Sequence, residues 1–281
     1  MIRTCVLVTH NDPDVTSAAV EEVLAIARET GINVVGLPDE LIRHGGREIG
    51  PVDLSSGTAP DVWLCLGGDG TILRGLRSAA ETRSPVYGIN FGEVGFLAAT
   101  DPEEGFAESV RRALTGDFDT LNLPALSTGD PGHPVAFNDF ALQRRPGLRV
   151  ADIAYLVGDE EVGRVRCDGV VLATPAGSTG YNLANGGPVV AWGVAGFAVS
   201  FIAPHSLTAR SLIVAPDDRV TLVNRSATEP VDIAIDGRPC GEVEPGGQIE
   251  ISFVENSGLL AQVPGSSFYH RLRQKFGRLA S

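Results

Sequence analysis

The chain has 281 residues, 43% of them hydrophobic, which allows two modest domains or one large domain with a sizeable core. Its formal net charge of -13 argues against nucleic acid or an anionic membrane surface as the main partner. The only lysine is Lys275, which excludes a Walker-type phosphate loop and the site of a protein kinase, since both need a lysine at a defined position.

The four cysteines lie far apart and mostly in apolar runs: Cys5, Cys65, Cys167 and Cys240. Neither they nor the scattered histidines show the spacing of metal ligands, so we expect reduced core cysteines and no zinc site. The apolar run at 5–8 is too short for a signal-peptide core, and the run at 188–204 is short for a membrane span and broken by glycines. We therefore expect a soluble, cytoplasmic protein.

The first third of the chain alternates strands and helices. Apolar runs predict strands at residues 4–9, 33–37, 62–66 and 85–90, and apolar residues at helical spacing predict helices at about 14–29 and 101–114. A polar, glycine-rich loop is predicted at 43–58. Strands that alternate with helices imply a parallel sheet covered on both faces.

A glycine turn with one acid, Gly-Gly-Asp-Gly-Thr, follows the strand at 62–66. We expect Gly67, Gly68 and Gly70 to form a turn with little steric bulk and Thr71 to open a helix. Backbone N–H groups in such a turn, together with the positive end of a helix dipole, form a phosphate site. Asp69 would then point a carboxylate at whatever carries the phosphate. These residues alone leave open the alternative that Asp69 merely stabilises the turn.

A second glycine turn, at residues 92–95, follows the strand at 85–90. Ligands of parallel sheets gather at the carboxyl ends of the strands. Both glycine turns are predicted to lie at such ends, so we expect a ligand site there. An acidic protein that binds phosphates must neutralise them locally, by a metal ion, backbone amides or arginines.

From residue 115 onward the pattern changes to short strands with turns between them. We predict strands at residues 135–143, 151–157, 162–166, 169–173, 197–202, 219–224, 231–235 and 248–253, with a hairpin turn at 158–161. The chain is therefore expected to form an α/β domain with a parallel sheet over 1–120 and a β-rich domain of stacked sheets over 121–264. The tail 265–281 reads as a short basic helix that packs back onto the first domain.

Small and polar residues are concentrated after the predicted strand at 169–173. They are Thr174, Pro175, Ala176, Gly177, Ser178, Thr179, Gly180, Tyr181, Asn182 and Asn185. We expect Ser178 and Thr179 to cap a helix whose free N–H groups face a cleft. Gly180 allows close backbone approach, and Tyr181 and Asn182 offer an aromatic face and an amide. This density of small polar residues favours a ligand-binding role over a structural turn.

Asn138 and Asp139 form a polar pair inside the apolar run 135–142. Side chains alternate along a strand, so one of the two would face inward. An inward polar group needs a partner, and the residues leave open whether that partner is a ligand or a buried hydrogen bond. Taken alone, Asp236-Gly-Arg238 is an ordinary turn and 204–210 an ordinary loop.

Together and in this order, these stretches resemble the NAD kinase family (ATP- or polyphosphate-dependent). The similarity is carried by residues 66–71, 90–97 with 101–104, Asn138-Asp139, Asp168-Gly169, 174–181 with Gly186-Gly-Pro188, 204–206 and Asp236-Gly237. GGDGT is shared with lipid kinases and 6-phosphofructokinases, whereas the block at 174–188 is far more specific.

The resemblance implies phosphoryl transfer to the 2′-hydroxyl of the adenosine ribose of NAD, giving NADP, with ATP or polyphosphate as donor and Mg²⁺ or another divalent cation. It makes Asp69 the candidate base and implies a homodimer or homotetramer. The phosphate turn would be Gly67, Gly68, Gly70 and Thr71. The dinucleotide would be bound by Gly68, Gly70, Asn138, Asp139, Asp168, Thr174, Ser178, Thr179, Gly180, Tyr181 and Asn182. No protein ligand of the metal is assigned.

Four positions depart from the usual family pattern. Ala176 stands where threonine is common, Gly180 where alanine is, Asn182 where serine is, and Asp139 where glutamate is. These four differences bear on whether the protein prefers NAD or NADH more than on which reaction it catalyses. The alternatives are a catalytically silent dinucleotide sensor, which retention of Asp69 disfavours, and a lipid kinase, which the block at 174–188 disfavours.

Overall fold

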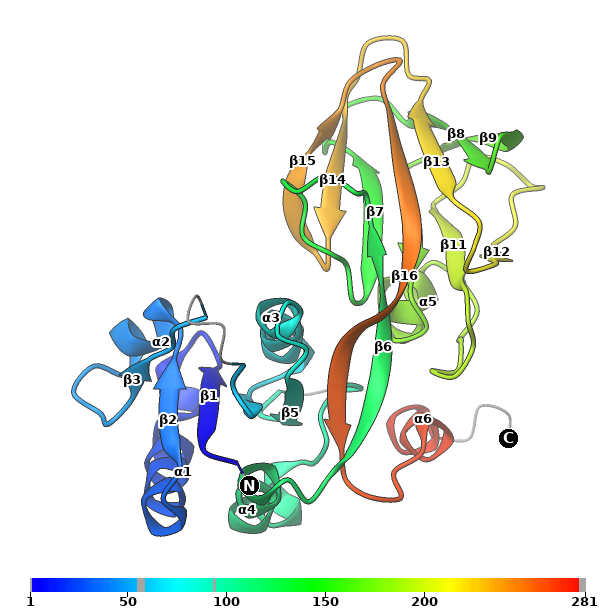
Figure 1. The fold of residues 1–281 in the computed structure, drawn as a ribbon. Helices are drawn as coiled ribbons and strands as arrows, with labels where there is room; N and C mark the ends of the chain where they lie inside the picture. Colours follow the sequence, from blue (N-terminus) through cyan, green and yellow to red (C-terminus); the bar gives the residue numbers. More distant parts are fainter. Residues whose placement is uncertain (1, 55–58, 93–94, 278–281) are drawn as a thin grey trace. The chain divides into compact units, whose positions relative to one another are not determined.

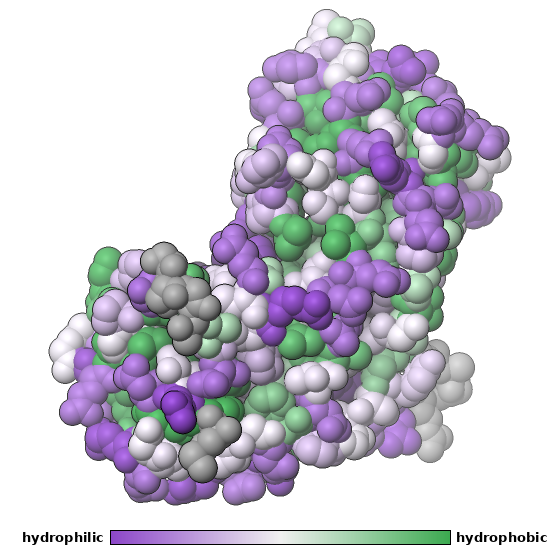
Figure 2. Space-filling model, in the orientation of Figure 1, coloured by the Kyte–Doolittle hydropathy of each residue, from purple (hydrophilic) through white to green (hydrophobic). Residues whose placement is uncertain are grey.

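The computed structural model describes residues 2–54, 59–92 and 95–277 (Figure 1). Parts of the predicted loop at 43–58, of the glycine turn at 92–95 and of the tail lie outside the described residues. Contacts divide the chain into two compact units: unit 1, residues 1–122 and 257–281, and unit 2, residues 123–256. Hydrophilic residues are spread over both units on the face shown in Figure 2. Within the described ranges, no helix combines the length and apolar composition needed to cross a membrane.

Unit 1 is an α/β unit with the parallel strand order β3-β2-β1-β4-β5, followed by the end of β16 (Figure 1). Its strands are β1 (Thr4–Thr9), β2 (Asn33–Gly36), β3 (Gly50–Pro51), β4 (Val62–Leu66) and β5 (Pro85–Ile89). Its helices are α1 (Ser17–Thr30), α2 (Pro38–Arg43), α3 (Asp69–Ala79), α4 (Phe106–Thr115) and α6 (Phe268–Phe276), with 3-10 turns at Pro13–Val15 and Pro102–Glu104. The predicted parallel sheet is confirmed.

The strands of unit 1 are buried on both faces, as a parallel sheet with helices on each side requires. One face packs with α1 and α4, through residues such as Leu64 and Val23. The other face packs with α3, where Gly75 lies against Cys65 and a Cβ on Gly88 would meet Ile72. The predicted helix at 101–114 is interrupted at Gly105, whose φ of 108° is left-handed.

Unit 2 consists of antiparallel strands in two sheets. A six-stranded sheet has the order β12-β11-β10-β7-β14-β15, and β16, β13, β8 and β9 pair in the second. The strands are β7 (Asp139–Arg144), β8 (Ala151–Val157), β9 (Glu160–Cys167), β10 (Gly169–Ala173), β11 (Phe197–Ile202), β12 (Leu212–Val214), β13 (Val220–Asn224), β14 (Val231–Ile235) and β15 (Arg238–Val243). The 3-10 turn Gly177–Thr179 and α5 (Tyr181–Ala184) follow β10, and the long strands β6 (Asp119–Ser127) and β16 (Gln248–Gln262) contribute residues to both units.

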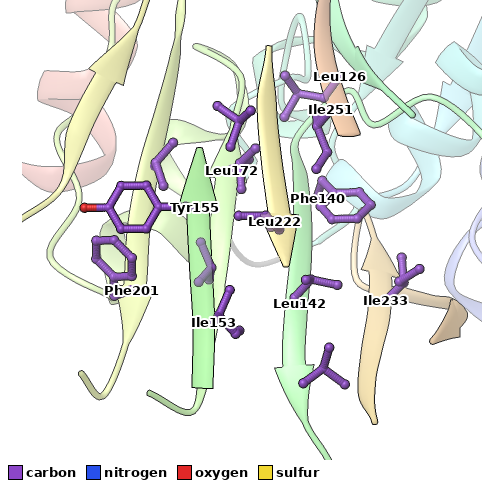
Figure 3. Close-up of a cluster of buried hydrophobic side chains, with 14 of the residues drawn as sticks. Leu126, Phe140, Leu142, Ile153, Tyr155, Leu172, Phe201, Leu222, Ile233 and Ile251 are labelled. Atoms are coloured by element: carbon purple, nitrogen blue, oxygen red, sulfur yellow. The ribbon is translucent and has the colours of Figure 1, made fainter. Parts of the chain in front are cut away.

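The core of unit 2 lies between its two sheets. Figure 3 shows Phe140, Leu142 and Leu172 of one sheet beside Ile153 and Leu222 of the other. The strands β10 and β13 are buried along their whole length, and the run of short strands separated by turns is the pattern that predicted the stacked sheets. The α/β plus β-rich fold class is confirmed. The predicted strand at 135–143 is wrong at its start, because β7 begins only at Asp139.

Candidate active site

The first glycine turn joins β4 to α3 at the carboxyl edge of the unit 1 sheet. The helix begins at Asp69, with Gly68 as its N-cap, so the prediction that Thr71 opens it is wrong by two residues. Thr71 lies in the first turn and packs against Gly67, where a Cβ would stand 2.3 Å from its hydroxyl oxygen. The free N–H groups of the helix start and the small glycines leave room for an anion at this edge.

The second glycine turn lies directly beside the first. The N–H of Gly67 donates to the carbonyl of Ile89 at 3.0 Å, at the end of β5. A Cβ on Gly92 would stand 3.2 Å from the Cα of Gly68, so the two backbones approach closely. Asn90 holds this turn by accepting the N–H of Gly92 at 3.0 Å. The described parts of both predicted turns therefore meet at one edge.

Asp69 is partly buried at the start of α3, and its carboxylate is held by backbone groups. One oxygen accepts the N–H of Phe96 at 2.9 Å and the other that of Leu97 at 3.0 Å. Burial raises the pKa of Asp69, and these two hydrogen bonds and the charges of Arg271 and Lys275 oppose that rise. Each carboxylate oxygen can accept a second hydrogen bond, so Asp69 can still bind a hydroxyl group.

In unit 2, the segment before β7 contacts the turn after β10. The buried Thr174 hydroxyl donates to the carbonyl of Phe137 at 2.6 Å and accepts the N–H of Gly177 at 3.0 Å. The N–H of Thr174 donates to the carbonyl of Asn138 at 2.9 Å. Gly177 fits only because it lacks a side chain, since a Cβ there would lie 2.0 Å from the Asn138 carbonyl oxygen.

Asn138 and Asp139 lie at this junction, and their side chains carry polar groups that are not used to hold it together. The Asn138 Oδ1 atom is buried and has no hydrogen-bond partner among the described residues. Asp139 is 7% exposed, and burial together with the charge of Asp236 raises its pKa to about 7. Asp236, which the sequence presented as an ordinary turn, accepts the N–H groups of residues 137–139. The signals available in the sequence were its position in an Asp-Gly turn after an alternating strand and the place of Asp236-Gly237 in the family resemblance.

Ser178 and Asn182 face the interior of unit 2, and the prediction that Ser178 and Thr179 cap a helix is wrong. Gly180 is the N-cap of the short helix α5, and no side chain caps it. The Ser178 hydroxyl, fully buried, accepts the N–H of Val190 at 2.9 Å. The Asn182 amide donates to the carbonyls of Ser178 and Pro188. In this structure, both side chains brace the loop that follows β10.

The remaining predicted residues separate into two groups. Burial raises the pKa of Tyr181, and the carboxylate charges of Asp139 and then Asp168 raise it further, so both acids lie within electrostatic reach of the ring; Gly180 is exposed beside it. Asp168 lies at the opposite end of β10 from Thr174, about 20 Å away at the rise of a strand. There it forms a bidentate ion pair with Arg144, which lowers the pKa of Asp168.

Replacing Thr174 by valine should destabilise unit 2 by about 1–3 kcal/mol, because the buried N–H of Gly177 and the carbonyl of Phe137 would each lose their partner. Urea unfolding of Thr174→Val against wild type measures this loss. Thr174→Ser keeps the hydroxyl and should recover most of it. Equal stability of the valine and serine variants would contradict a structural role for this hydroxyl.

Asp139 should make stability depend on pH, because its pKa is about 7 in the folded protein against 3.8 ordinarily. The folded chain then holds the proton more tightly, so the free energy of unfolding falls as pH rises from about 4 to 7 and is constant above that range. Asp139→Asn cannot ionise and should lack this decrease. From pH 5 to pH 8, we expect the free energy of unfolding of the variant to rise relative to that of the wild type by on the order of 2 kcal/mol, measured by urea unfolding. Parallel curves for the two proteins would contradict the assignment.

The side chains of the described residues do not form a resident metal centre. In residues 2–54, 59–92 and 95–277, no three His, Cys, Asp or Glu side chains are grouped to hold a metal ion. Mg²⁺ is commonly held by one or two carboxylates together with substrate phosphates. A glycine turn with one neighbouring carboxylate fits a cation that arrives on the phosphates of a donor.

A parallel sheet that ends in a glycine turn with one partly buried acid, joined to a β-rich unit with a polar turn, is an arrangement suited to enzymes that transfer phosphoryl groups. Sequence models support the assignment: the ATP-NAD kinase N-terminal domain matches residues 48–118 and the ATP-NAD kinase C-terminal domain matches residues 137–262. The chain belongs to the NAD kinase family. An NAD kinase of Symbiobacterium thermophilum is 34% identical over 277 residues, covering 96% of this chain and 97% of that protein.

Two solved structures share the fold. The NAD kinase of Archaeoglobus fulgidus in complex with ATP is 26% identical with a TM-score of 0.71, covering 98% of each chain. The yeast NADH kinase complexed with NADH is 23% identical with a TM-score of 0.83, covering 100% of this chain and 89% of that one. The family predicted from the motifs is confirmed, and so is its enzyme class, a phosphotransferase.

Proposed function

We propose that this protein phosphorylates the 2′-hydroxyl of the adenosine ribose of NAD, giving NADP, with ATP or polyphosphate as donor. The observation that carries the proposal is the setting of Asp69, a carboxylate fixed at a helix start beside two glycine turns. The named substrates of the relatives, NAD, NADH and ATP, support it.

Asp69 acts as the general base in this reaction. Its carboxylate accepts the proton of the 2′-hydroxyl while the hydroxyl oxygen attacks the terminal phosphorus of the donor. The bond from that phosphorus to the bridging oxygen breaks, and its electron pair leaves with the shortened donor. The raised pKa of Asp69 brings its proton affinity closer to neutral pH, where a base works best. A bound Mg²⁺ supplies neutralisation of the phosphate charge.

Unit 2 binds the dinucleotide in this proposal. Asn138 and Asp139 offer an amide oxygen and a carboxyl group without partners among the described residues. Tyr181 offers a half-buried aromatic face, and Gly180 leaves the backbone accessible beside it. Thr174 and Ser178 hold the turn in place through backbone hydrogen bonds. Asp168, at the far end of β10, is proposed to contact a more distant part of the dinucleotide.

The test is an assay of NADP formation by the purified protein with Mg²⁺ and NAD. ATP, other nucleoside triphosphates and polyphosphate are supplied in turn, with NADH as the competing acceptor. We expect turnover with at least one donor. Dinucleotide binding without turnover on any donor would contradict the proposal and favour a sensor. Gel filtration with light scattering tests the proposed homodimer or homotetramer.

A further inference from the structure

The turn between β14 and β15 carries an acid that the reaction proposed above does not use. Asp236 and Gly237 both have left-handed backbone conformations, with φ of 46° and 72°. The Asp236 carboxylate accepts the N–H groups of Asn138 at 2.7 Å and of Phe137 and Asp139 at 3.3 Å. In return, the N–H of Asp236 donates to the carbonyl of Asp139 at 2.9 Å. The turn therefore holds this segment from both sides.

The segment that Asp236 holds, residues 137–139, lies at the start of strand β7. β7 starts at Asp139, so Phe137 and Asn138 precede the strand and are not aligned by its ladder. The side chains of Asn138 and Asp139 nevertheless keep an unpartnered oxygen and an unpartnered carboxyl group within the described residues. The backbone is fixed while the side chains remain available to a ligand, which is how a binding site is preorganised.

We propose that Asp236 is a positioning residue for dinucleotide binding, fixing residues 137–139 so that Asn138 and Asp139 present their side chains to the dinucleotide. This inference rests on the proposed function. It assigns to the Asp-Gly turn a role in binding that the turn sequence alone does not indicate.

The charge of Asp236 adds a second effect. Among the described residues, two titratable groups face Asp139: the carboxylate of Asp236 from the β14–β15 turn and the phenol of Tyr181 from α5. Burial first, and then the Asp236 charge, raise the pKa of Asp139 to about 7. Removing that charge lowers the pKa of Asp139, because burial alone then opposes ionisation. The pH midpoint of dinucleotide binding should therefore also shift to a lower value.

The experiment compares three variants. Asp236→Asn removes the charge and keeps one acceptor oxygen, and Asp236→Gly removes the carboxylate in a turn where glycine tolerates the left-handed φ. The control is Asp232→Asn, on the same strand β14, whose carboxylate pairs with Arg145 at 2.8 Å. KM for NAD, KM for the donor and kcat are measured from pH 5.5 to 8.5, and NAD binding by calorimetry.

We expect Asp236→Gly to raise KM for NAD on the order of tenfold or more, because three backbone hydrogen bonds to a charged group are lost. KM for the donor should stay within about twofold. Asp236→Asn should shift the pH midpoint of NAD binding to a lower value, and Asp232→Asn should leave both quantities unchanged. A structural role alone would lower the melting temperature without raising KM for NAD.

Unchanged KM for NAD in both Asp236 variants would overturn the inference. Should Asp236→Gly fail to fold, the NAD affinity of Asp236→Asn, measured by calorimetry at a pH where Asp139 is ionised in both proteins, decides alone. If the wild-type protein binds NAD but does not phosphorylate it, the proposed function fails, and calorimetry of the same variants still tests the positioning role.

Discussion

Replacing Asp69 by asparagine should lower kcat by about two to four powers of ten and leave NAD binding intact. The amide cannot accept the 2′-hydroxyl proton, while its size is nearly that of the carboxylate. Initial rates at saturating NAD and donor give kcat, and calorimetry gives the affinity for NAD. In the wild type, kcat should fall as the pH drops through the raised pKa of Asp69, since the base acts in its ionised form.

The variant also disturbs local structure, so a matched control is needed. An amide at position 69 would aim its NH₂ at the N–H of Phe96 or Leu97, which costs about 1–3 kcal/mol of stability. At the other end of β4, one carboxylate oxygen of Asp61 accepts two backbone N–H groups, those of Arg3 and Thr4, each at 2.8 Å. Asp61→Ala removes both hydrogen bonds and should lower stability without affecting kcat. If the two variants lower kcat equally, Asp69 is not the base.

Replacing Gly177 by alanine should destabilise unit 2 by about 3 kcal/mol or more. The new Cβ would stand 2.0 Å from the carbonyl oxygen of Asn138 and 2.6 Å from its Cα. These are backbone atoms, so no side-chain rotation can relieve the clash, and the segment before β7 must move. Because Asn138 and Asp139 belong to that segment, NAD binding should weaken together with stability. Urea unfolding and calorimetry measure the two effects.

Gly180 provides the control three residues further along the same turn. A Cβ there would be 3.5 Å from the carbonyl oxygen of Gly177, which is an ordinary contact, but the ψ of −122° lies outside the backbone regions that residues with a side chain favour. Gly180→Ala should therefore lower stability by about 1 kcal/mol, well below the loss in Gly177→Ala. A Gly177→Ala protein as stable as Gly180→Ala would show that residues 137–139 and 174–177 do not pack as described.

Short-range sequence signals determined much of the fold. The strand at 62–66, the glycine turn and the helix after it are local features, and the structure has them within two residues of the predicted bounds. In unit 2 the predicted strands 151–157, 169–173, 197–202 and 231–235 coincide with β8, β10, β11 and β14, because short apolar runs bounded by turn residues mark buried strands. β12 and β15 were not predicted, because β12 is short and β15 contains glycine and proline.

Only the tertiary structure decided how the site residues are held. The amides that bind Asp69 lie 27 and 28 residues further along the chain, and the acid that holds residues 137–139 lies almost a hundred residues away. Ser178 and Asn182 carry the same kinds of polar group as the proposed ligand contacts, yet they face the interior. The sequence determined by itself the family and the glycine turns, and it singled out Asp69 as the candidate base. Hydrogen bonds between distant segments determine which polar side chains stay free for a ligand, and no local pattern records those bonds.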